Sequence, residues 1–504
     1  MTELTYPSGL SPNVGVVSLQ SILDCIAPRE VLRFRHLRVA GLAFYSGEVQ
    51  PGNLFFAIHG TRHNGSVYAN EALRRGAVAV VAEEPLNLPC PVLVVKNARQ
   101  ALADAARLYY GDPSKDIDVV GITGTNGKTT VAHLIRSCLE LEGESAGIIG
   151  TNGYDFGGRV VPNQNTTPDP MRVNGYIREM ADRGARACVM EVSSHALVQD
   201  RVRGVEFAVG VFTNLTPEHL DYHGTIEEYA KAKSELFRML GGRSTACICL
   251  DSPMAQMMIE ACADEVFLAT FGLHSGARVR AENLICKLEG TKFDLVMPRG
   301  RVELMLRLPG RHNVENALAA ATAALSLGVS ELSIAAALER CRSVDGRLEL
   351  VGRSDDVQVF VDYAHTPDAL EQVCSTLASL TKGRLLVVFG CGGDRDRSKR
   401  PLMSDAVARF AGVGFMTSDN PRSEDPDSIL DDMEQGLNGD AGRFYRIVDR
   451  REAIQRAVQT ARPGDTVLIA GKGHESYQIL RDSVIPFDDR EEARLALAAK
   501  VGHE

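Results

Sequence analysis

The stretch that decides the fold is Gly121-Ile-Thr-Gly-Thr-Asn-Gly-Lys-Thr-Thr130. The β-branched run at 118–124 and the amphipathic segment at 128–143 predict a strand, a tight loop and a helix. Glycines allow such a loop to wrap around a phosphate, and the start of the helix offers unpaired backbone N–H groups. A glycine-rich turn without a ligand is the alternative, but the Gly-Lys-Thr ending in a strand-to-helix context favours an ATP site.

The residues of this loop have distinct expected roles. Lys128 would contact the β- and γ-phosphate oxygens of ATP, and Thr129 would ligate Mg²⁺. The strict motif has a glycine six positions before Lys128, where this chain has Ile122 with Gly121 and Gly124 on either side. The loop residues expected to bind ATP are Gly124, Thr125, Asn126, Gly127, Lys128, Thr129 and Thr130.

Short β-branched runs alternate with amphipathic helices on both sides of the loop. The runs are at residues 118–124, 187–192, 207–215, 384–393, 412–420 and 465–473. This alternation predicts an α/β fold of parallel sheets with crossover helices. In such folds function gathers at the carboxyl ends of the strands, where most of the unusual residues of this chain lie.

The length of 504 residues suits about three domains. Turn-rich residues 111–114 and the hairpin-like stretch after residue 346 mark two boundaries. The predicted segments are an N-terminal domain at 1–115, a central P-loop ATPase-type parallel sheet at 116–348 and a C-terminal Rossmann-like domain at 349–504.

Composition excludes several classes of function. With 55 Lys plus Arg and 65 Asp plus Glu, the net charge of −10 argues against nucleic-acid or anionic-membrane binding. No apolar run reaches the roughly 18 residues of a membrane span, and residues 1–15 lack a signal-peptide pattern. The 11 cysteines are scattered, and Cys247 and Cys249 fall in a strand without a second ligand cluster, which disfavours zinc. We therefore expect a cytoplasmic protein with reduced thiols.

Nine further segments follow the loop in an order that resembles the Mur ligase family. They are residues 166–170 (TTPDP), 191–195 (EVSSH), 214–224 (NLTPEHLDYHG), 310–316 (GRHNVEN), 346–347 (GR), 362–367 (DYAHTP), 390–395 (GCGGDR), 419–422 (DNPR) and 471–475 (GKGHE). The resemblance is strongest to members that add the third peptide residue. It implies an ATP-dependent ligase, acting as a monomer, that joins an amino acid to UDP-N-acetylmuramoyl-L-alanyl-D-glutamate through an acyl phosphate.

The N-terminal segment matches this family least well. Residues 49–54 (VQPGNL) resemble the turn of its first, UDP-binding domain, and Asn64-Gly65 falls in a second segment used near the nucleotide. Where the family usually has Asp-Ser-Arg, this chain has Tyr45-Ser46-Gly47. Ser46 remains the candidate uridine contact.

The resemblance also implies the metal ligands. Glu191 would hold Mg²⁺ together with Thr129, and His219 would hold a second Mg²⁺. Lys233 would be carbamylated by CO₂ and become an anionic oxygen ligand, whereas Lys231 lies outside the family pattern. From the residues alone, Glu191 could equally begin a helix, His219 would be a solvated loop residue, and Lys233 would be a solvated lysine on an amphipathic helix.

Further contacts follow from the same resemblance. Asn316 and Asp362 would hold the adenosine, and Arg347 would stabilise the transferring phosphoryl group. The catalytic set is then Lys128, Lys233 and Arg347. The contacts implied for the muramoyl dipeptide, besides Ser46, are Thr166, Thr167, Ser193, Gln199, Arg201 and Lys233.

The incoming amino acid is expected to be meso-diaminopimelate rather than L-lysine. Diaminopimelate carries a side-chain carboxylate that lysine lacks, and a guanidinium pairs with a carboxylate through two parallel hydrogen bonds. Arg422 alternatively pairs with Glu424 or Asp425 in an acidic loop. The residues expected to bind diaminopimelate are Arg395, Asp419, Asn420, Pro421, Arg422, Gly471 and Glu475.

Three rival functions stay open at this point. One is another member of the same family, such as a D-alanyl-D-alanine-adding ligase or a folylpolyglutamate synthetase, which the Asp-Asn-Pro-Arg segment disfavours. A second is a P-loop kinase or nucleotide switch that needs no amine. The third is a non-catalytic scaffold, against which Lys128, Glu191 and Lys233 argue.

Overall fold

The computed structural model describes residues 15–501, except 61–63, 164, 438 and 440. The chain forms two compact units, here called unit 1 (Met1–Phe271 with Ala319–Ser330) and unit 2 (Gly272–Leu318 with Glu331–Glu504). The strands of each large sheet fall within one of the three predicted segments, although the compact units divide the chain differently. The three-domain boundaries therefore stay a prediction. Most of residues 1–15, in which no signal-peptide pattern was found, lies outside the described residues.

Unit 1 begins with a five-stranded sheet in the order β2-β7-β6-β5-β4. Its strands are β2 (Glu30–Leu32), β4 (Gly41–Ala43), β5 (Asn53–Phe56), β6 (Ala79–Ala82) and β7 (Val92–Val94). Helices α1 (Leu19–Ile26) and α3 (Ala98–Tyr109) share one apolar core with this sheet, and α2 (Ala69–Arg74) belongs to another. Every residue of β5 and β6 is buried, as expected for parallel strands covered on both faces.

The central sheet of unit 1 carries the glycine-rich loop. Its parallel strands lie in the order β9-β12-β8-β13-β14-β15. They are β8 (Asp118–Thr123), β9 (Ala146–Gly150), β12 (Ala187–Glu191), β13 (Val209–Phe212), β14 (Thr245–Cys249) and β15 (Phe267–Gly272). The register pairs Glu191 with Ile122 and Phe212 with Thr123, so three strands end at one edge. The α/β fold predicted from the sequence is confirmed.

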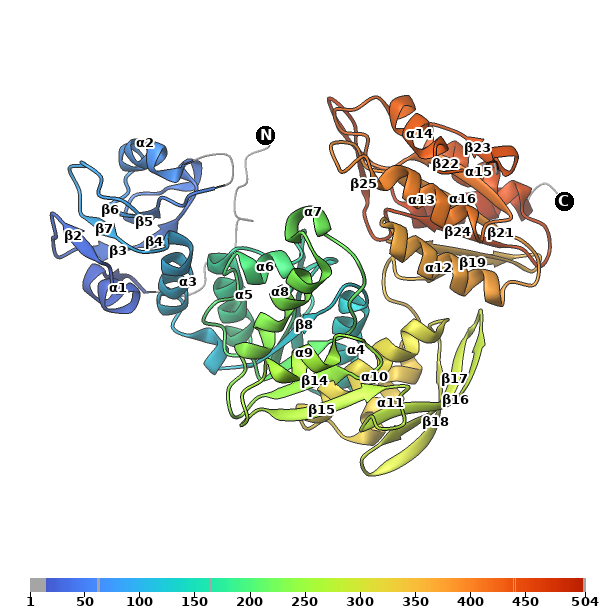
Figure 1. The fold of residues 1–504 in the computed structure, drawn as a ribbon, viewed down its shortest axis with the longest axis horizontal. Helices are drawn as coiled ribbons and strands as arrows, with labels where there is room; N and C mark the ends of the chain where they lie inside the picture. The colour runs from blue at the N-terminus through green and yellow to red at the C-terminus, as the bar shows by residue number, and fades with distance from the viewer. Residues whose placement is uncertain (1–14, 61–63, 164, 438, 440, 502–504) are drawn as a thin grey trace. The chain divides into compact units, whose positions relative to one another are not determined.

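Crossover helices cover this sheet. They are α4 (Lys128–Leu141), α5 (Pro170–Asp182), α6 (Ser194–Val198), α7 (Leu220–His223), α8 (Ile226–Arg238) and α9 (Ala255–Glu260). Short antiparallel strands β10 (Gly153–Asp155) and β11 (Val160–Val161) extend the β9 edge. Apolar residues of α5, α8 and α9 form one core with alternate residues of the strands. In Figure 1, α3 and α5 lie side by side, in agreement with their packing.

Unit 2 contains an antiparallel meander and a second α/β sheet. The meander is β16 (Val279–Lys287), β17 (Gly290–Met297) and β18 (Gly300–Leu306), and α11 (Glu331–Arg340) packs on β18. The sheet has the order β19-β20-β24-β21-β22-β23. Its strands are β19 (Glu349–Ser354), β20 (Val357–Asp362), β21 (Leu385–Cys391), β22 (Val413–Ser418), β23 (Phe444–Arg446) and β24 (Thr466–Ala470). Only β19 is antiparallel to its neighbour, which confirms the predicted hairpin.

Helices cover both faces of this second sheet (Figure 1). On one face lie α12 (Pro367–Leu380), α13 (Lys399–Ala408) and α14 (Pro426–Glu434), and on the other α15 (Arg450–Thr460) and α16 (Asp489–Val501). A hairpin of β25 (Tyr477–Ile479) and β26 (Val484–Pro486) follows β24, and α10 (Arg311–Ser326) precedes α11. Within the described residues, no helix is long and apolar enough to cross a membrane.

Candidate active site

The glycine-rich loop of unit 1 connects β8 to α4 as predicted. Gly124 has a φ of +147° and Gly127 has a φ of +88°, which L side chains rarely adopt. A Cβ on Gly124 would also clash with the Thr213 hydroxyl. Ile122, which departs from the strict motif, is fully buried in β8, so the departure lies in the sheet and leaves the loop itself intact.

The segment after β13 holds this loop in place. Asn214 accepts hydrogen bonds from the Thr125 amide at its carbonyl oxygen (3.0 Å) and from the Asn126 amide at Oδ1 (2.9 Å). Thr213 Oγ1 donates to the Asn126 carbonyl at 2.7 Å. Thr130 is buried in the first turn of α4. The loop is therefore fixed by long-range contacts, as a preorganised phosphate site requires.

Two lysines converge on one carbonyl oxygen of the loop. Lys128 Nζ donates to Gly124 O at 2.8 Å and to Thr125 O at 2.7 Å, and Lys233 Nζ donates to Gly124 O at 2.9 Å. Lys233 is only 1% exposed, and burial together with the Lys128 charge holds its pKa well below the ordinary value. Lys231, by contrast, is exposed and pairs with Glu228. The interpretation of Lys233 as a solvated helix residue is wrong.

A carboxylate and a hydroxyl meet beside the loop. Thr129 Oγ1 donates to Glu191 Oε1 at 2.9 Å, and Glu191 is 1% exposed at the end of β12. Thr151, which the sequence did not single out, donates its amide to Oε1 (2.8 Å) and its hydroxyl to Oε2 (3.1 Å). Oxygen ligands of this kind are the type that Mg²⁺ prefers, so Thr129 and Glu191 fit the predicted metal.

His219 lies in a separate cluster of rings in the same unit. It caps the N-terminus of α7 with a φ of +56°, and its ring centroid lies 4.8 Å from that of His195 and 6.2 Å from that of Tyr229. Tyr229 in turn lies under Lys233, whose Nζ is 4.4 Å from the ring centroid. Burial, and then the neighbouring His219 and His223, lower the pKa of His195 to about 4. The structure thus places His219 near Lys233 through Tyr229.

Five of the predicted dipeptide contacts, all except Ser46 and Lys233, form one hydrogen-bonded group. Thr167 Oγ1 donates to the Glu191 carbonyl at 2.8 Å and accepts from the Ser193 amide at 3.1 Å. Arg201 donates to the Thr167 carbonyl at 2.7 Å and to Gln199 Oε1 at 2.8 Å. Another member, Thr166, has its hydroxyl 3.2 Å from that of Thr151. This group therefore extends directly from the Glu191 site.

Gln199 and Arg201 also line a cavity of about 310 Å³ in unit 1. Other residues that line this cavity are Phe44, Tyr45, Glu48, Arg99, Asp169 and Arg172. The predicted uridine contact, Ser46, is not among the lining residues. It is 8% exposed, and its hydroxyl donates to Glu71 at 3.0 Å. The cavity is nevertheless lined by arginines and a tyrosine, which suit an anionic nucleotide.

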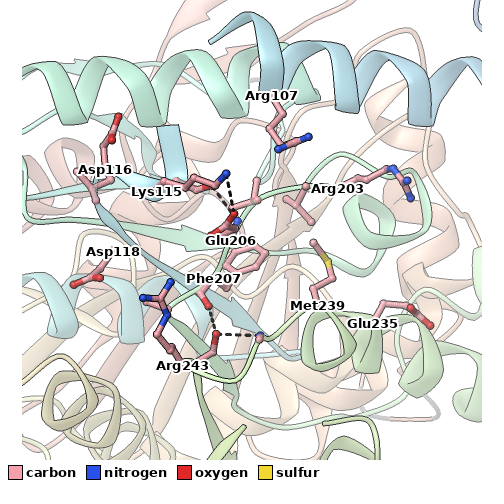
Figure 2. Close-up of a pocket in the computed structure, with 18 of the residues that line it drawn as sticks. Arg107, Lys115, Asp116, Asp118, Arg203, Glu206, Phe207, Glu235, Met239 and Arg243 are labelled. Atoms are coloured by element: carbon pink, nitrogen blue, oxygen red, sulfur yellow. Dashed lines mark hydrogen bonds and ion pairs between the residues drawn. The ribbon is translucent and has the colours of Figure 1, made fainter. Parts of the chain in front are cut away.

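A larger cavity, of about 1400 Å³, lies at the opposite edge of the central sheet (Figure 2). Residues at or just before the amino ends of β8, β12 and β14 line it, including Asp118, Arg186 and Ser244. Several of its charged side chains pair with one another, for example Lys115 with Glu206 at 3.6 Å. Because catalysis in parallel α/β sheets takes place at the carboxyl edge, this cavity is not the candidate active site.

In unit 2, Asp362 ends β20, and its carboxylate is buried and hydrogen-bonded to backbone amides. Its two oxygens accept from the Leu348 amide (2.6 Å) and the Ala364 amide (2.7 Å). Burial raises its pKa, and the Arg347 charge and these amides oppose that shift. The Arg347 guanidinium stacks over Tyr363 at 4.8 Å. Asn316 lies elsewhere, buried in α10, and donates to Asn313 at 3.2 Å.

The Asp419–Arg422 loop follows β22 and packs against the turn after β21. The Gly393 amide donates to the Asn420 carbonyl at 2.9 Å, and a Cβ on Gly393 would clash with the Pro421 carbonyl. Arg422, with a φ of +53°, donates to the Gly393 carbonyl at 2.8 Å. A Cβ on Gly392 would lie 2.9 Å from Arg422 Nη1 and 3.6 Å from Arg395 Cγ. The two predicted arginines are therefore neighbours.

Arg422 does not pair with the acidic residues that follow it. Glu424 instead forms an ion pair with Arg400 at 2.7 Å, and Arg400, which is 1% exposed, also pairs with Asp432 at 2.9 Å. No carboxylate among the described residues lies within ion-pair distance of the Arg422 guanidinium. Arg400 was not predicted from the sequence, because it lies in a charge-rich run that is typical of a solvent-exposed segment. The guanidinium of Arg422 remains available for a carboxylate ligand.

The remaining predicted contacts meet at the end of β24. Asn420 Nδ2 donates to Glu475 Oε2 at 3.0 Å, and Lys472 Nζ donates to the same oxygen at 3.0 Å. Gly471 has a φ of +121°, and a Cβ there would lie 2.9 Å from Asp419 Oδ2. Lys472 lies inside the GKGHE segment, but no role was predicted for it.

Family comparisons match the chain in three places. The Mur ligase middle domain matches residues 122–324, the glutamate ligase domain of Mur ligases matches 346–473, and the catalytic domain of the Mur ligase family matches 38–112.

Individual relatives match along nearly the whole chain. A protein of Geobacillus thermodenitrificans, named UDP-N-acetylmuramoyl-L-alanyl-D-glutamate–2,6-diaminopimelate ligase, is 45% identical over 487 residues, with 95% of this chain and 99% of the relative covered. A protein of Halalkalibacterium halodurans with the same name is 44% identical, with 96% and 99% covered. A solved structure of a ligase of that name has a TM-score of 0.69 at 35% identity, with 97% and 100% covered.

Proposed function

Because the chain belongs to the Mur ligase family, we propose that it is an ATP-dependent ligase that joins meso-diaminopimelate to UDP-N-acetylmuramoyl-L-alanyl-D-glutamate in peptidoglycan precursor synthesis. The observation that carries the choice of amino acid is Arg422, whose guanidinium has a neighbouring arginine and no carboxylate partner among the described residues. This arrangement suits the side-chain carboxylate of diaminopimelate.

The reaction makes an amide bond from a carboxylate. The glutamate carboxylate attacks the γ-phosphorus of ATP, which gives an acyl phosphate and ADP. The amine of diaminopimelate then attacks the acyl carbon to give a tetrahedral intermediate, which loses inorganic phosphate and a proton and leaves the amide. The first step depends on positioning and on neutralising phosphate charge, rather than on covalent chemistry by the protein.

The loop of unit 1 supplies the positive charge for the phosphoryl transfer. Lys128 begins α4 at the end of the loop, and its hydrogen bonds to Gly124 O and Thr125 O fix its position. Arg347 would stabilise the transferring phosphoryl group. Asn316 and Asp362 would hold the adenosine, and the carboxylate of Asp362 is already fixed by two backbone amides.

Thr129 and Glu191 would hold Mg²⁺, which neutralises phosphate charge when it is bound. The hydrogen bond between these two side chains already places a hydroxyl and a carboxylate oxygen together. His219 and a carbamate on Lys233 would hold a second Mg²⁺. Carbamylation needs an unprotonated amine near CO₂, and the burial of Lys233 favours the neutral form.

The UDP-linked dipeptide would bind along unit 1. Its peptide end would lie on the hydrogen-bonded group of Thr166, Thr167, Ser193, Gln199 and Arg201, which extends from Glu191. Its nucleotide end would enter the cavity of about 310 Å³. Ser46 would then follow the lining residue Tyr45 without lining the cavity itself.

Several broader expectations belong to the same proposal. The segments 1–115, 116–348 and 349–504 would be the UDP-binding, ATP-binding and amino-acid-binding domains. The protein would act as a monomer in the cytoplasm, where its nucleotide substrates are found, and its eleven cysteines, all free thiols, suit a reducing compartment. Binding of substrates to different domains implies closure before chemistry.

An acceptor panel tests this function. ADP release would be measured with the UDP-muramoyl dipeptide and, in turn, meso-diaminopimelate, L-lysine, D-alanyl-D-alanine and no amine. We expect turnover with diaminopimelate to exceed that with lysine by at least about a hundredfold, because lysine would leave the half-buried guanidinium of Arg422 without a carboxylate partner. Equal use of lysine would overturn the specificity, and full ATP turnover without an amine would favour the kinase or switch.

A further inference from the structure

Lys472 is a buried cation that the proposed reaction does not use. It is 0% exposed, and its Nζ donates to Glu475 Oε2 at 3.0 Å and to Asn420 Oδ1 at 3.2 Å. The same Nζ lies 5.6 Å from the centroid of the Tyr477 ring. A buried ammonium is costly unless it is paired and hydrogen-bonded, and here both conditions are met by two residues of the proposed diaminopimelate site.

The contacts of Lys472 determine how Asn420 is oriented. Asn420 Oδ1 accepts from Lys472 Nζ and from the Ile479 amide, the latter at 2.9 Å. Two donors converging on one atom require the carbonyl oxygen there, so Nδ2 must point the other way, toward Glu475 Oε2 at 3.0 Å. Asn420 is 3% exposed and cannot turn without breaking these bonds.

The same contacts leave one oxygen of Glu475 without a donor. Lys472 and Asn420 both donate to Oε2. Among the described residues no hydrogen bond to Oε1 is formed, although a carboxylate oxygen can accept two. The side chain of Glu475 remains 17% exposed. Oε1 is thus an acceptor held in a fixed place at the surface of the site.

We propose that Lys472 is a positioning residue for the incoming amino acid. It fixes Glu475 through one oxygen and thereby presents the other oxygen to an ammonium group of the amino-acid substrate. It also fixes Asn420, one of whose amide hydrogens is left for the substrate. This inference rests on the proposed function, because it assigns the ammonium contact to Glu475.

The variant Lys472→Met tests the proposal, because methionine fills a similar volume without a charge or a donor. We expect the KM for meso-diaminopimelate to rise about tenfold to a hundredfold, which corresponds to the loss of hydrogen bonds to charged groups. The KM for ATP should stay within about twofold, since the ATP contacts are elsewhere. A merely structural role would instead lower the melting temperature and affect both KM values alike.

Lys500→Met is the matched control. Lys500 Nζ donates to the carbonyl oxygens of Val458 (3.1 Å) and Ala461 (2.7 Å), so this lysine stabilises the same unit without touching the site. We expect this variant to lose thermal stability and to keep its KM for diaminopimelate. If Lys472→Met melts below the assay temperature, Lys472→Gln, which keeps a neutral donor, carries the same test.

A double-mutant cycle with Glu475→Gln shows whether Lys472 acts through Glu475. The combined rise in KM should be clearly smaller than the product of the two single effects. Independent, multiplying effects, or an unchanged KM in a folded Lys472 variant, would overturn the proposal. If the wild-type enzyme does not ligate diaminopimelate at all, the proposed function fails instead, and the two failures are therefore distinguishable.

Discussion

The glycine-rich loop of unit 1 and the Asp419–Arg422 loop of unit 2 both carry cations that we propose bind an anionic ligand, but the two loops are built differently. In the first, backbone conformation decides the site, because Gly124 and Gly127 adopt positive φ and Lys128 bonds to the loop carbonyls. In the second, buried side chains hold the loop, with Arg400 binding Glu424 and Lys472 binding Asn420. The sequence signal of the glycine-rich loop is therefore local, although distant residues such as Asn214 hold the loop in place. The Asp419–Arg422 loop has no comparable local signal.

The largest loss of activity should come from a change in the glycine-rich loop of unit 1. We expect Lys128→Ala to lower kcat at least about a thousandfold, because a preorganised charge is removed from the transferring phosphoryl group. ADP release under saturating substrates measures this loss. Lys231→Ala, which removes an exposed lysine paired with Glu228, is the control and should keep normal turnover. Near-normal turnover of a folded Lys128→Ala protein would show that the loop is not part of the active site.

This difference between the sites explains how much the sequence could predict. The loop at 121–130, the α/β fold and the strand ends were readable because hydrophobic period and glycine position are local signals. The pairing of Thr151 with Glu191 was not, since it joins the turn after β9 to the end of β12. Arg400 and Lys472 were missed for a similar reason. A charged residue is expected to be exposed until its distant partner is known, and that partner is Glu424 for Arg400 and Asn420 for Lys472.

A change in the Asp419–Arg422 loop should alter the KM for the amino acid more than the KM for ATP. We expect Arg422→Ala to raise the KM for diaminopimelate about a hundredfold and to leave the KM for ATP within about twofold, because a charge-assisted hydrogen-bond pair is lost. Steady-state kinetics with each substrate varied in turn would measure both values. Arg409→Ala, which removes an exposed arginine paired with Glu371 and Asp405, is the control. An equal rise in both KM values would mean that Arg422 acts on the whole fold.

A smaller effect should follow from crowding the two arginines. In Gly392→Ala the new methyl group would lie 2.9 Å from Arg422 Nη1, so the guanidinium must shift by a few tenths of an ångström. We expect the KM for diaminopimelate to rise roughly threefold to tenfold, as small misplacements of charged groups do. Gly442→Ala, at a glycine with open space around it, is the control in the same unit and should change nothing. An unchanged KM in Gly392→Ala would show that Arg422 tolerates displacement.

The smallest expected effect is on the free energy of unfolding. It arises because Lys128 and Lys233 both lie at the Gly124 carbonyl oxygen. Burial and the charge of Lys128 hold the pKa of Lys233 below its ordinary value in the folded protein, whereas the unfolded chain has the ordinary value. Between these two values the unfolded state binds more protons, so the free energy of unfolding rises with pH through that window. Below the window the lysine destabilises the fold by a constant amount.

Lys233→Met should therefore be inactive but more stable than the wild type at pH 7, by roughly 1–3 °C in melting temperature. The measurement is thermal melting in bicarbonate-free buffer, because a carbamate would replace the amine. The advantage of the variant should shrink as pH approaches the ordinary lysine value of about 10.5. Lys231→Met should show neither effect, since Lys231 is exposed. A variant less stable than the wild type at every pH would mean that the hydrogen bond from Lys233 to Gly124 outweighs the cost of burying the lysine.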